Sequence, residues 1–319
     1  MKKAIRIIGS IIGILILAIL LVWLGLNIAK LIIYRDYLSS KEDVSKLPGL
    51  SDGFVPQGLA YVDGKDAYLH SGYNGHSVEV YCVIGKESRL YHVLDENGAI
   101  LDGHGGGIAD YGDFVYIACN SKIYAYRLAD FLNGKDGDNV ALLASYEVDT
   151  PASFCFVLDN ELLVGEFYEP VAYETDPTHH YTTPEGDVNH AIVSSYTILP
   201  DGSITDTPNY HISLPDRVQG FAFNRDGIIA ISCSWSINSS SLTFFDGVLP
   251  ADKQITEGVP LYYVGQKNLI KTVKMPAMSE GIDLMGEKLV ISFESACNKY
   301  IFGKLFFAFE VASHPFPAK

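Results

Sequence analysis

The sequence predicts an all-β domain of five similar sheets behind one N-terminal transmembrane helix. Two observations lead to this prediction. One long apolar segment stands near the start of the 319-residue chain, and a pattern of two short strands recurs five times after it. Repetition of a small β unit at intervals of tens of residues is typical of radial or stacked β architectures. The 20 tyrosines and 16 phenylalanines also favour strands, because aromatic side chains suit a pleated, half-buried surface.

The first element is the apolar segment Ile7–Ile28, whose 22 residues carry no formal charge. As a helix rising about 1.5 Å per residue it reaches roughly 33 Å, enough to cross the hydrocarbon core of a bilayer. The residues that follow make a poor signal-peptide cleavage site, so we expect an uncleaved anchor. The basic residues Lys2, Lys3 and Arg6 favour a cytoplasmic N-terminus. We therefore expect a single-pass protein of the cell membrane with an extracytoplasmic domain.

The expected organisation has three regions: a cytoplasmic tip and anchor at residues 1–33, a short polar stalk at 34–42 and a β domain at 43–319. The formal charge is −15, but residues 1–35 contain five basic and no acidic side chains. The remainder therefore has 18 basic against 38 acidic residues, a net charge of −20. A domain with this charge would repel phosphate, which argues against a nucleic-acid partner.

Each repeat opens with a polar or small residue and, in four copies, a glycine; two apolar stretches separated by a tight turn follow. The copies begin at Gln57-Gly58, Gly106-Gly107, Ala152-Ser153, Gln219-Gly220 and Glu280-Gly281. Third and fourth strands are predicted at Ser77–Val83 and Arg89–Leu94, at Lys122–Leu128 and Ala141–Val148, and at Ala191–Leu199 and Asn209–Leu214. The fourth copy offers Ser241–Phe245 or Leu261–Val264 as its third strand, then Leu269–Met275, and the fifth offers only Leu305–Val311.

The missing last strand of the fifth copy predicts how the domain closes. The segment Val44–Pro48 is similar to His211–Pro215 and Thr272–Pro276, which precede the fourth and fifth copies. We therefore predict that the N-terminal segment supplies the outer strand of the fifth sheet and closes a ring. Closure removes exposed sheet edges. The predicted fold is a five-bladed β-propeller, with six blades as the alternative because the third and fourth copies are longer.

The five-fold pattern resembles β-propeller proteins generally, over roughly residues 43–319. The last copy adds a sharper motif, which reads Ser279-Glu280-Gly281-Ile282, Phe293-Glu294-Ser295-Ala296 and Lys299-Tyr300. This motif is similar to a signature of uncharacterised secreted bacterial propellers. The resemblance implies the architecture and no activity.

The repeats also predict where a site would lie. In a four-stranded blade the start of the innermost strand and the end of the second strand lie on the same face. Side chains there surround the mouth of the central channel. The candidates for ligand binding are Gln57, Tyr73, His104, Asn120, Glu166, Gln219, Trp235, Glu280 and Glu294. The alternative is that these polar groups only satisfy neighbouring backbone amides or hold water.

Three of these residues are also candidates for catalysis. Glu166 and Glu294 each lie thirteen residues after the equivalent points Ser153 and Gly281, so we expect both to face the channel axis. Facing carboxylates raise each other's pKa or recruit a cation. Together with Glu280 they could serve as acid and base in cleavage of a saccharide. Ca²⁺ prefers oxygen ligands of this kind and is the one cofactor that the sequence suggests.

The third copy carries a long insertion, Phe167–Asn189, that leaves from the predicted channel face. Long segments without a strand pattern in compact domains are usually functional or disordered. Its aromatic side chains would suit a lid over the mouth, and a mobile solvated loop is the alternative. The adjacent His179 and His180 suggest zinc only weakly, because no third ligand stands at a recognisable spacing.

Two functions remain open from the sequence. The first is an anchored, extracytoplasmic propeller that binds a glycan, a protein or a component of the cell envelope at the channel mouth. The second is a hydrolase or lyase that uses Glu166, Glu280 and Glu294 on a saccharide or lactone-like substrate, with or without Ca²⁺. Because propellers host both classes, the fold alone does not decide between them.

Overall fold

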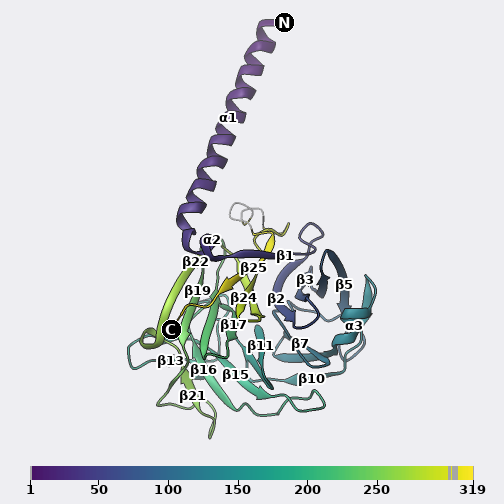
Figure 1. Ribbon diagram of the computed structural model, residues 1–319, viewed down its shortest axis with the longest axis vertical. Helices are drawn as coiled ribbons and strands as arrows, with labels where there is room; N and C mark the ends of the chain where they lie inside the picture. Colours follow the sequence, from purple (N-terminus) through teal and green to yellow (C-terminus); the bar gives the residue numbers. More distant parts are fainter. Residues whose placement is uncertain (1, 301–302, 304–307, 319) are drawn as a thin grey trace.

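The computed structural model describes residues 2–300, 303 and 308–318. Five β-sheets, or blades, surround a central axis, and one long helix projects from their rim (Figure 1). The fold is a five-bladed β-propeller, as the sequence predicts. Since the described strands form five blades, the six-bladed alternative is wrong.

The blades follow one another along the chain. Blade 1 contains β2 (Val55–Val62), β3 (Ala67–Asn74), β4 (Ser77–Ile84), β5 (Glu87–Val93) and, parallel at its outer edge, β9 (Asp138–Val140). Blade 2 contains β6 (Gly107–Tyr111), β7 (Phe114–Cys119), β8 (Lys122–Arg127) and β10 (Ala144–Glu147), with helix α3 (Leu128–Asn133) after β8. Blade 3 contains β11 (Phe154–Leu158), β12 (Glu161–Gly165), β15 (Ala191–Thr197), β16 (Tyr210–Leu214), β21 (Leu261–Tyr263) and β20 (Leu249–Pro250). Blade 4 contains β17 (Val218–Phe223), β18 (Ile228–Cys233), β19 (Ser240–Asp246) and β22 (Leu269–Met275). Blade 5 contains β23 (Ser279–Met285), β24 (Lys288–Phe293), β25 (Glu310–Pro315) and β1 (Glu42–Lys46).

The ring closes between the two ends of the domain. The N-terminal strand β1 pairs antiparallel with β25, with Asp43 opposite Ala312 and Lys46 opposite Glu310. The inner strands contact one another in the cyclic order β2, β6, β11, β17, β23, and β23 returns to β2. Closure by the N-terminal segment is therefore confirmed.

Two predicted strands differ from the structure. The third strand of blade 4 is β19, whereas Leu261–Val264 contributes β21, which pairs parallel with β16 in blade 3. The chain leaves blade 4 after β19 and returns to it only at β22, which a pattern of apolar residues cannot show. In blade 5, residues 305–307 of the predicted strand Leu305–Val311 lie outside the described residues, and β25 begins at Glu310.

Glycine at the start of the inner strands lets the blades meet closely at the axis. A Cβ atom on Gly58 would lie 2.6 Å from the backbone nitrogen of Ile108 in blade 2. A Cβ atom on Gly281 would lie 2.7 Å from the backbone nitrogen of Leu59 in blade 1. Both distances are shorter than a carbon atom can approach, so only glycine fits between neighbouring inner strands.

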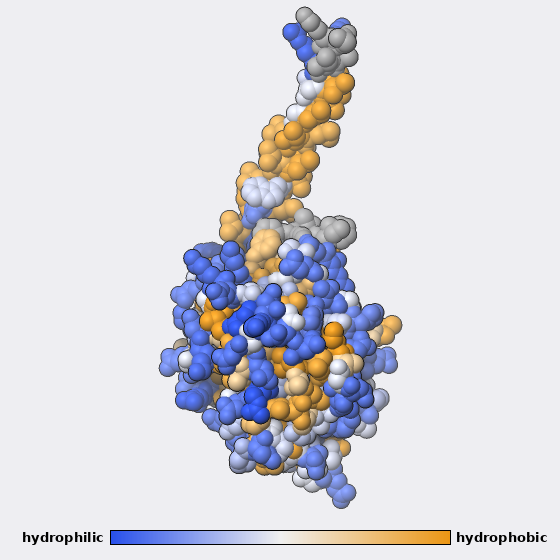
Figure 2. All heavy atoms as spheres, turned by 90° about the vertical axis from the view of Figure 1, so that its right-hand side faces the viewer, coloured by the Kyte–Doolittle hydropathy of each residue, from blue (hydrophilic) through white to orange (hydrophobic). Residues whose placement is uncertain are grey.

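The N-terminal helix α1 (Lys2–Ile33) projects from the propeller, and its segment Arg6–Ile33 is long and apolar enough to cross a membrane. Figure 2 shows its apolar surface above a largely hydrophilic domain. Its length and composition are compatible with a membrane anchor and with a signal sequence alike.

The segment expected to be a polar stalk lies on the propeller. It contains the short helix α2 (Arg35–Ser40), which contacts β22 and β25. Tyr34 and Tyr37 are both buried, and the Tyr37 ring stacks on His314 of β25 with 6.1 Å between ring centres. Large aromatic side chains gain more from burial than from solvation, which explains why this segment docks.

Candidate functional site

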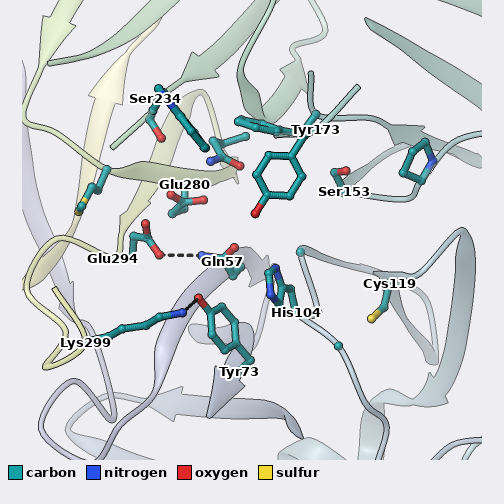
Figure 3. Close-up of a pocket in the computed structure, with 18 of the residues that line it drawn as sticks. Gln57, Tyr73, His104, Cys119, Ser153, Tyr173, Ser234, Glu280, Glu294 and Lys299 are labelled. Atoms are coloured by element: carbon teal, nitrogen blue, oxygen red, sulfur yellow. Dashed lines mark hydrogen bonds between the residues drawn. The ribbon is translucent and has the colours of Figure 1, made fainter. Parts of the chain in front are cut away.

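A cavity of about 920 Å³ lies at one mouth of the central channel (Figure 3). Eight of the nine predicted binding residues line it: Gln57, Tyr73, His104, Asn120, Gln219, Trp235, Glu280 and Glu294. They come from four blades, and Ser153, at the equivalent point of blade 3, also lines the cavity. The repeat pattern therefore brings these side chains together.

Irregular pairing of the inner strands aims three of these side chains at the axis. The register of strand pairing shifts between Pro56 and Gly58, between Val218 and Gly220, and between Ser279 and Ile282. The shifts fall at Gln57, Gln219 and Glu280. A bulge of this kind bends the strand and redirects a side chain, and it recurs at the same point of blades 1, 4 and 5.

Glu280 and Glu294 form a pair of neighbouring carboxyl groups in the cavity (Figure 3). Burial and the charge of Glu294 raise the pKa of Glu280 well above its ordinary value, although a hydrogen bond with Ser234 opposes the shift. Burial raises the pKa of Glu294 to about 8, against the opposing effects of Lys299 and Gln57. Gln57 Nε2 donates a 3.0 Å hydrogen bond to Glu294 Oε2. The pair therefore retains at least one proton at neutral pH.

A second group of side chains, Lys299, Tyr73 and His104, lies in the same cavity. The Nζ atom of Lys299 donates a 2.6 Å hydrogen bond to the hydroxyl of Tyr73. The Tyr73 ring stacks on the imidazole of His104 with 4.5 Å between ring centres. Burial and the nearby Lys299 charge lower the pKa of His104, so its ring is neutral at pH 7. One cation and one neutral imidazole thus lie in the same cavity as the two carboxyl groups, with Lys299 next to Glu294.

The inserted segment of blade 3 supplies aromatic side chains to the same cavity. Phe167 and Tyr173 line it together with Trp235, and each of their rings lies 6.0 Å from the Trp235 ring, centre to centre. The segment is folded and contains the 3-10 turn η1 (Pro177–His179) and the strand pair β13 (Tyr181–Thr182) and β14 (Val188–Asn189). It contributes an aromatic wall to the mouth.

The structure does not bring Glu166 into this cavity. Its side chain has no exposed surface, and both carboxylate oxygens lie 3.0 Å from His179 Nδ1. Its Oε1 atom also accepts a 3.0 Å hydrogen bond from the backbone N–H of Ile192. Burial lowers the pKa of His179, but the hydrogen bond and charge of Glu166 outweigh burial and raise it. The expectation that Glu166, like Glu294, lies at the channel mouth is therefore wrong, because the inserted segment places His179 over Glu166.

The donor set does not fit a calcium ion. Within residues 2–300, 303 and 308–318, no group of three or more His, Cys, Asp and Glu side chains lies close enough to hold a metal ion. Glu280 and Glu294 supply two carboxyl groups, whereas Ca²⁺ takes about six to eight oxygen ligands. The Lys299 charge beside Glu294 also competes with a cation. We therefore assign no step to a metal.

Two residues of the cavity, Lys299 and Tyr300, were not among the predicted site residues. They follow β24 by a few positions, so the strand pattern alone does not place them. The signal that could have found them is the shared motif of the last repeat, which includes both. A lysine close after Glu294 also stands out in a domain with a net charge of −20.

No protein-family model matches the chain, and no curated protein matches it significantly. Several solved structures share the general fold. The PQQ-bound aldose sugar dehydrogenase of Streptomyces coelicolor is 14% identical, with 86% of this chain and 95% of that chain covered and a TM-score of 0.49. Glutaminyl cyclase of Myxococcus xanthus is 11% identical, with 87% and 97% covered and a TM-score of 0.43. A gluconolactonase of Xanthomonas campestris is 13% identical, with 87% and 89% covered and a TM-score of 0.40. At these identities the likeness concerns the fold alone.

Proposed function

We propose that this chain is a membrane-anchored propeller that binds a saccharide in the cavity at its channel mouth. The observation that carries the proposal is the convergence of amide and carboxyl groups from several blades with the aromatic rings of Phe167, Tyr173 and Trp235 on one concave site. Cavities of this size accept small organic ligands. The anchor in this proposal is α1, and the basic residues in its first two turns favour an extracytoplasmic domain.

The chemistry of the lining matches a polyhydroxylated ligand. The amide of Gln219 offers both donors and an acceptor, and a protonated Glu280 offers one of each. Gln57 offers its amide oxygen, because its Nε2 already donates to Pro56 and Glu294. Hydroxyl groups of a sugar need such mixed partners. The faces of Trp235 and Tyr173 can pack against the C–H face of a sugar ring, which buries apolar surface while the hydroxyls stay hydrogen-bonded.

The test is direct binding by the full chain in detergent micelles. Screening on a glycan array should identify a saccharide, and calorimetric titration should then give its Kd. Gln219→Ala should weaken binding by about tenfold, because a buried hydrogen bond contributes roughly 1 to 1.5 kcal/mol. The control Gln254→Ala replaces an exposed glutamine outside the cavity and should leave Kd unchanged. No binding of any saccharide by the wild type would overturn the proposal.

A second function is favoured by one specific observation, the coupled carboxyl pair Glu280 and Glu294. In hydrolysis, the protonated carboxyl group would donate its proton to the leaving oxygen of a glycoside or lactone. The ionised partner would take a proton from the attacking water as the C–O bond breaks. The raised pKa of both groups supports the role of the acid, because at least one proton remains in the pair near neutral pH. The role of the base requires that the other carboxyl group is ionised.

This alternative predicts turnover that depends on both acids. Panels of nitrophenyl glycosides and of lactones should reveal a substrate, and Glu294→Gln or Glu280→Gln should abolish its hydrolysis. Glu287→Gln changes an exposed acid at the opposite end of the β23–β24 hairpin and should retain full activity. Full activity of Glu294→Gln would exclude Glu294 as the essential acid or base.

A further inference from the structure

A second cavity, of about 580 Å³, lies between blades 3 and 4. Two residues, Ser234 and Trp235, line both this cavity and the one at the channel mouth. They are consecutive and follow directly after β18. The two cavities are therefore adjacent and share Ser234 and Trp235 as lining residues.

Ser234 and Trp235, the residues that line both cavities, are positioned by contacts with residues on both sides. The backbone N–H of Ser234 donates a 3.0 Å hydrogen bond to the carbonyl of Arg217, and the Ser234 hydroxyl bonds to Glu280 in the first cavity. The Trp235 ring packs against Phe167 and Tyr173, which belong to the first cavity. A ligand that occupies either cavity would thus contact residues that also bound the other.

The lining of the second cavity combines three charged side chains with several hydroxyl groups. Asp216 lies 2.8 Å from His190, Arg217 lies 3.3 Å from Glu169, and Asp187 accepts a 2.8 Å hydrogen bond from a backbone N–H. Ser241, Thr243 and Thr272 contribute hydroxyl groups from β19 and β22, and those of Thr243 and Thr272 lie 3.3 Å apart and bond to each other. Each of these hydroxyl groups can make a further hydrogen bond to a ligand. Hydroxyl groups donate and accept, as the hydroxyls of a sugar do.

The volumes of the two cavities also favour a ligand that is larger than one compact molecule. Sites for single small ligands occupy roughly 300 to 1,000 Å³. The volume of the first cavity lies near the upper end of this range, and the volume of the second also lies within it. Together they exceed what one compact ligand fills.

We infer that the two cavities are consecutive subsites for one linear oligosaccharide, which passes across Trp235 from the channel mouth to the groove between blades 3 and 4. The inference rests on the proposed saccharide binding and extends it from a single unit to a chain. Trp235 would stack on the sugar unit at the junction, and the hydroxyls of β19 and β22 would bind the units beyond it.

The test measures affinity against chain length. The probes are oligosaccharides of two to eight units from chitin, cellulose and polygalacturonate, titrated into the full chain in detergent micelles. We expect one series to bind, with affinity rising about tenfold or more between its shortest and its longer members. Ser241→Tyr fills the second cavity and should reduce the affinity for long members to that for short ones, which it should leave unchanged. Ser88→Tyr, at an exposed position of β5 outside both cavities, should change neither.

A milder variant keeps the test valid if the tyrosine disturbs folding. Thr243→Val removes one hydroxyl without changing the shape of the side chain, and should weaken only the long members. Affinity independent of length, or equal loss for short and long members in both variants, overturns the inference and leaves saccharide binding intact. Failure of all three series to bind overturns the inference together with the proposed function.

Discussion

Glu166 and Glu294 occupy the same place in blades 3 and 5, one residue after the second strand, yet their surroundings differ completely. Glu294 lies in the channel-mouth cavity beside Glu280, Gln57 and Lys299. Glu166 is sealed from solvent by His179 and by the backbone N–H of Ile192. The repeat therefore determines where the backbone places a glutamate. The loop that follows determines which residues this glutamate contacts.

This difference separates a structural acid from a candidate functional one. The hydrogen bonds of Glu166 are complete within the protein, and they hold the inserted segment against blade 3. Burial raises the pKa of both acids, but Glu294 lines the cavity, where a ligand can reach its carboxyl group, and Glu166 does not. Buried charged groups in stable proteins are usually paired, so the two cavity acids, for which the described residues show no ion pair, are the ones that suggest ligand chemistry.

The largest expected effect concerns the structural acid. Glu166→Ala leaves His179 and the Ile192 N–H buried without their partner, so the free energy of unfolding should fall by about 3 kcal/mol. Urea unfolding followed by circular dichroism measures this loss. Fluorescence of Trp235 should also change, because Phe167 and Tyr173 of the inserted segment contact its ring.

The matched control for this change is Glu166→Gln. The amide oxygen still accepts a hydrogen bond from Ile192, so the variant should lose only about 1 kcal/mol. Trp23→Phe removes the other tryptophan of the chain, in α1, so that the fluorescence reports Trp235 alone. If Glu166→Ala unfolds at the same urea concentration as the wild type, the pair with His179 has no structural role.

A smaller effect on the free energy of unfolding is expected for Glu294, the acid in the cavity, and this effect depends on pH. The pKa of Glu294 is raised from 4.5 in the unfolded chain to about 8 in the folded one, so the folded state binds the proton more tightly. Its contribution to stability is fully present below pH 4.5 and is lost as the pH rises towards 8. Glu294→Gln cannot ionise, so its free energy of unfolding should exceed that of the wild type by about 1 kcal/mol or more at pH 8.

Comparison with Glu287→Gln isolates this effect. Glu287 is exposed in the same hairpin, so its replacement controls for the loss of one carboxyl group outside the cavity. Asp283, with a pKa of about 8, remains in both variants and cancels in the difference. Glu280 adds to the effect of Glu294→Gln, because the Glu294 charge raises its pKa. A difference between Glu294→Gln and the wild type that stays constant from pH 5 to pH 8 would contradict the raised pKa.

The sequence predicts the fold more completely than the site. The polar residue and glycine that open the repeats mark the inner strands, because Gly58 and Gly281 are required where neighbouring strands nearly touch. The same pattern places Gln57, Gln219 and Glu280 in the cavity. It could not place Glu166, whose surroundings depend on how 23 inserted residues fold back. Nor could it place Leu261–Val264, since an apolar strand in isolation does not reveal which sheet it joins.

The smallest expected effect is that of calcium. Its measurement tests whether Glu294, unlike Glu166, helps to bind a cation. If a cation bridged Glu280 and Glu294, their raised pKa values would be replaced by ionised, metal-bound carboxylates. The ion would stabilise the folded state by about 2.7 kcal/mol at a concentration one hundred times its Kd. Because the cavity offers two carboxyl groups beside the Lys299 ammonium, we expect no measurable change in Tm on adding Ca²⁺ or EDTA at pH 7. A rise in Tm with Ca²⁺ that Glu294→Gln removes, and that Glu166→Gln retains, would show that the cavity acids hold a metal.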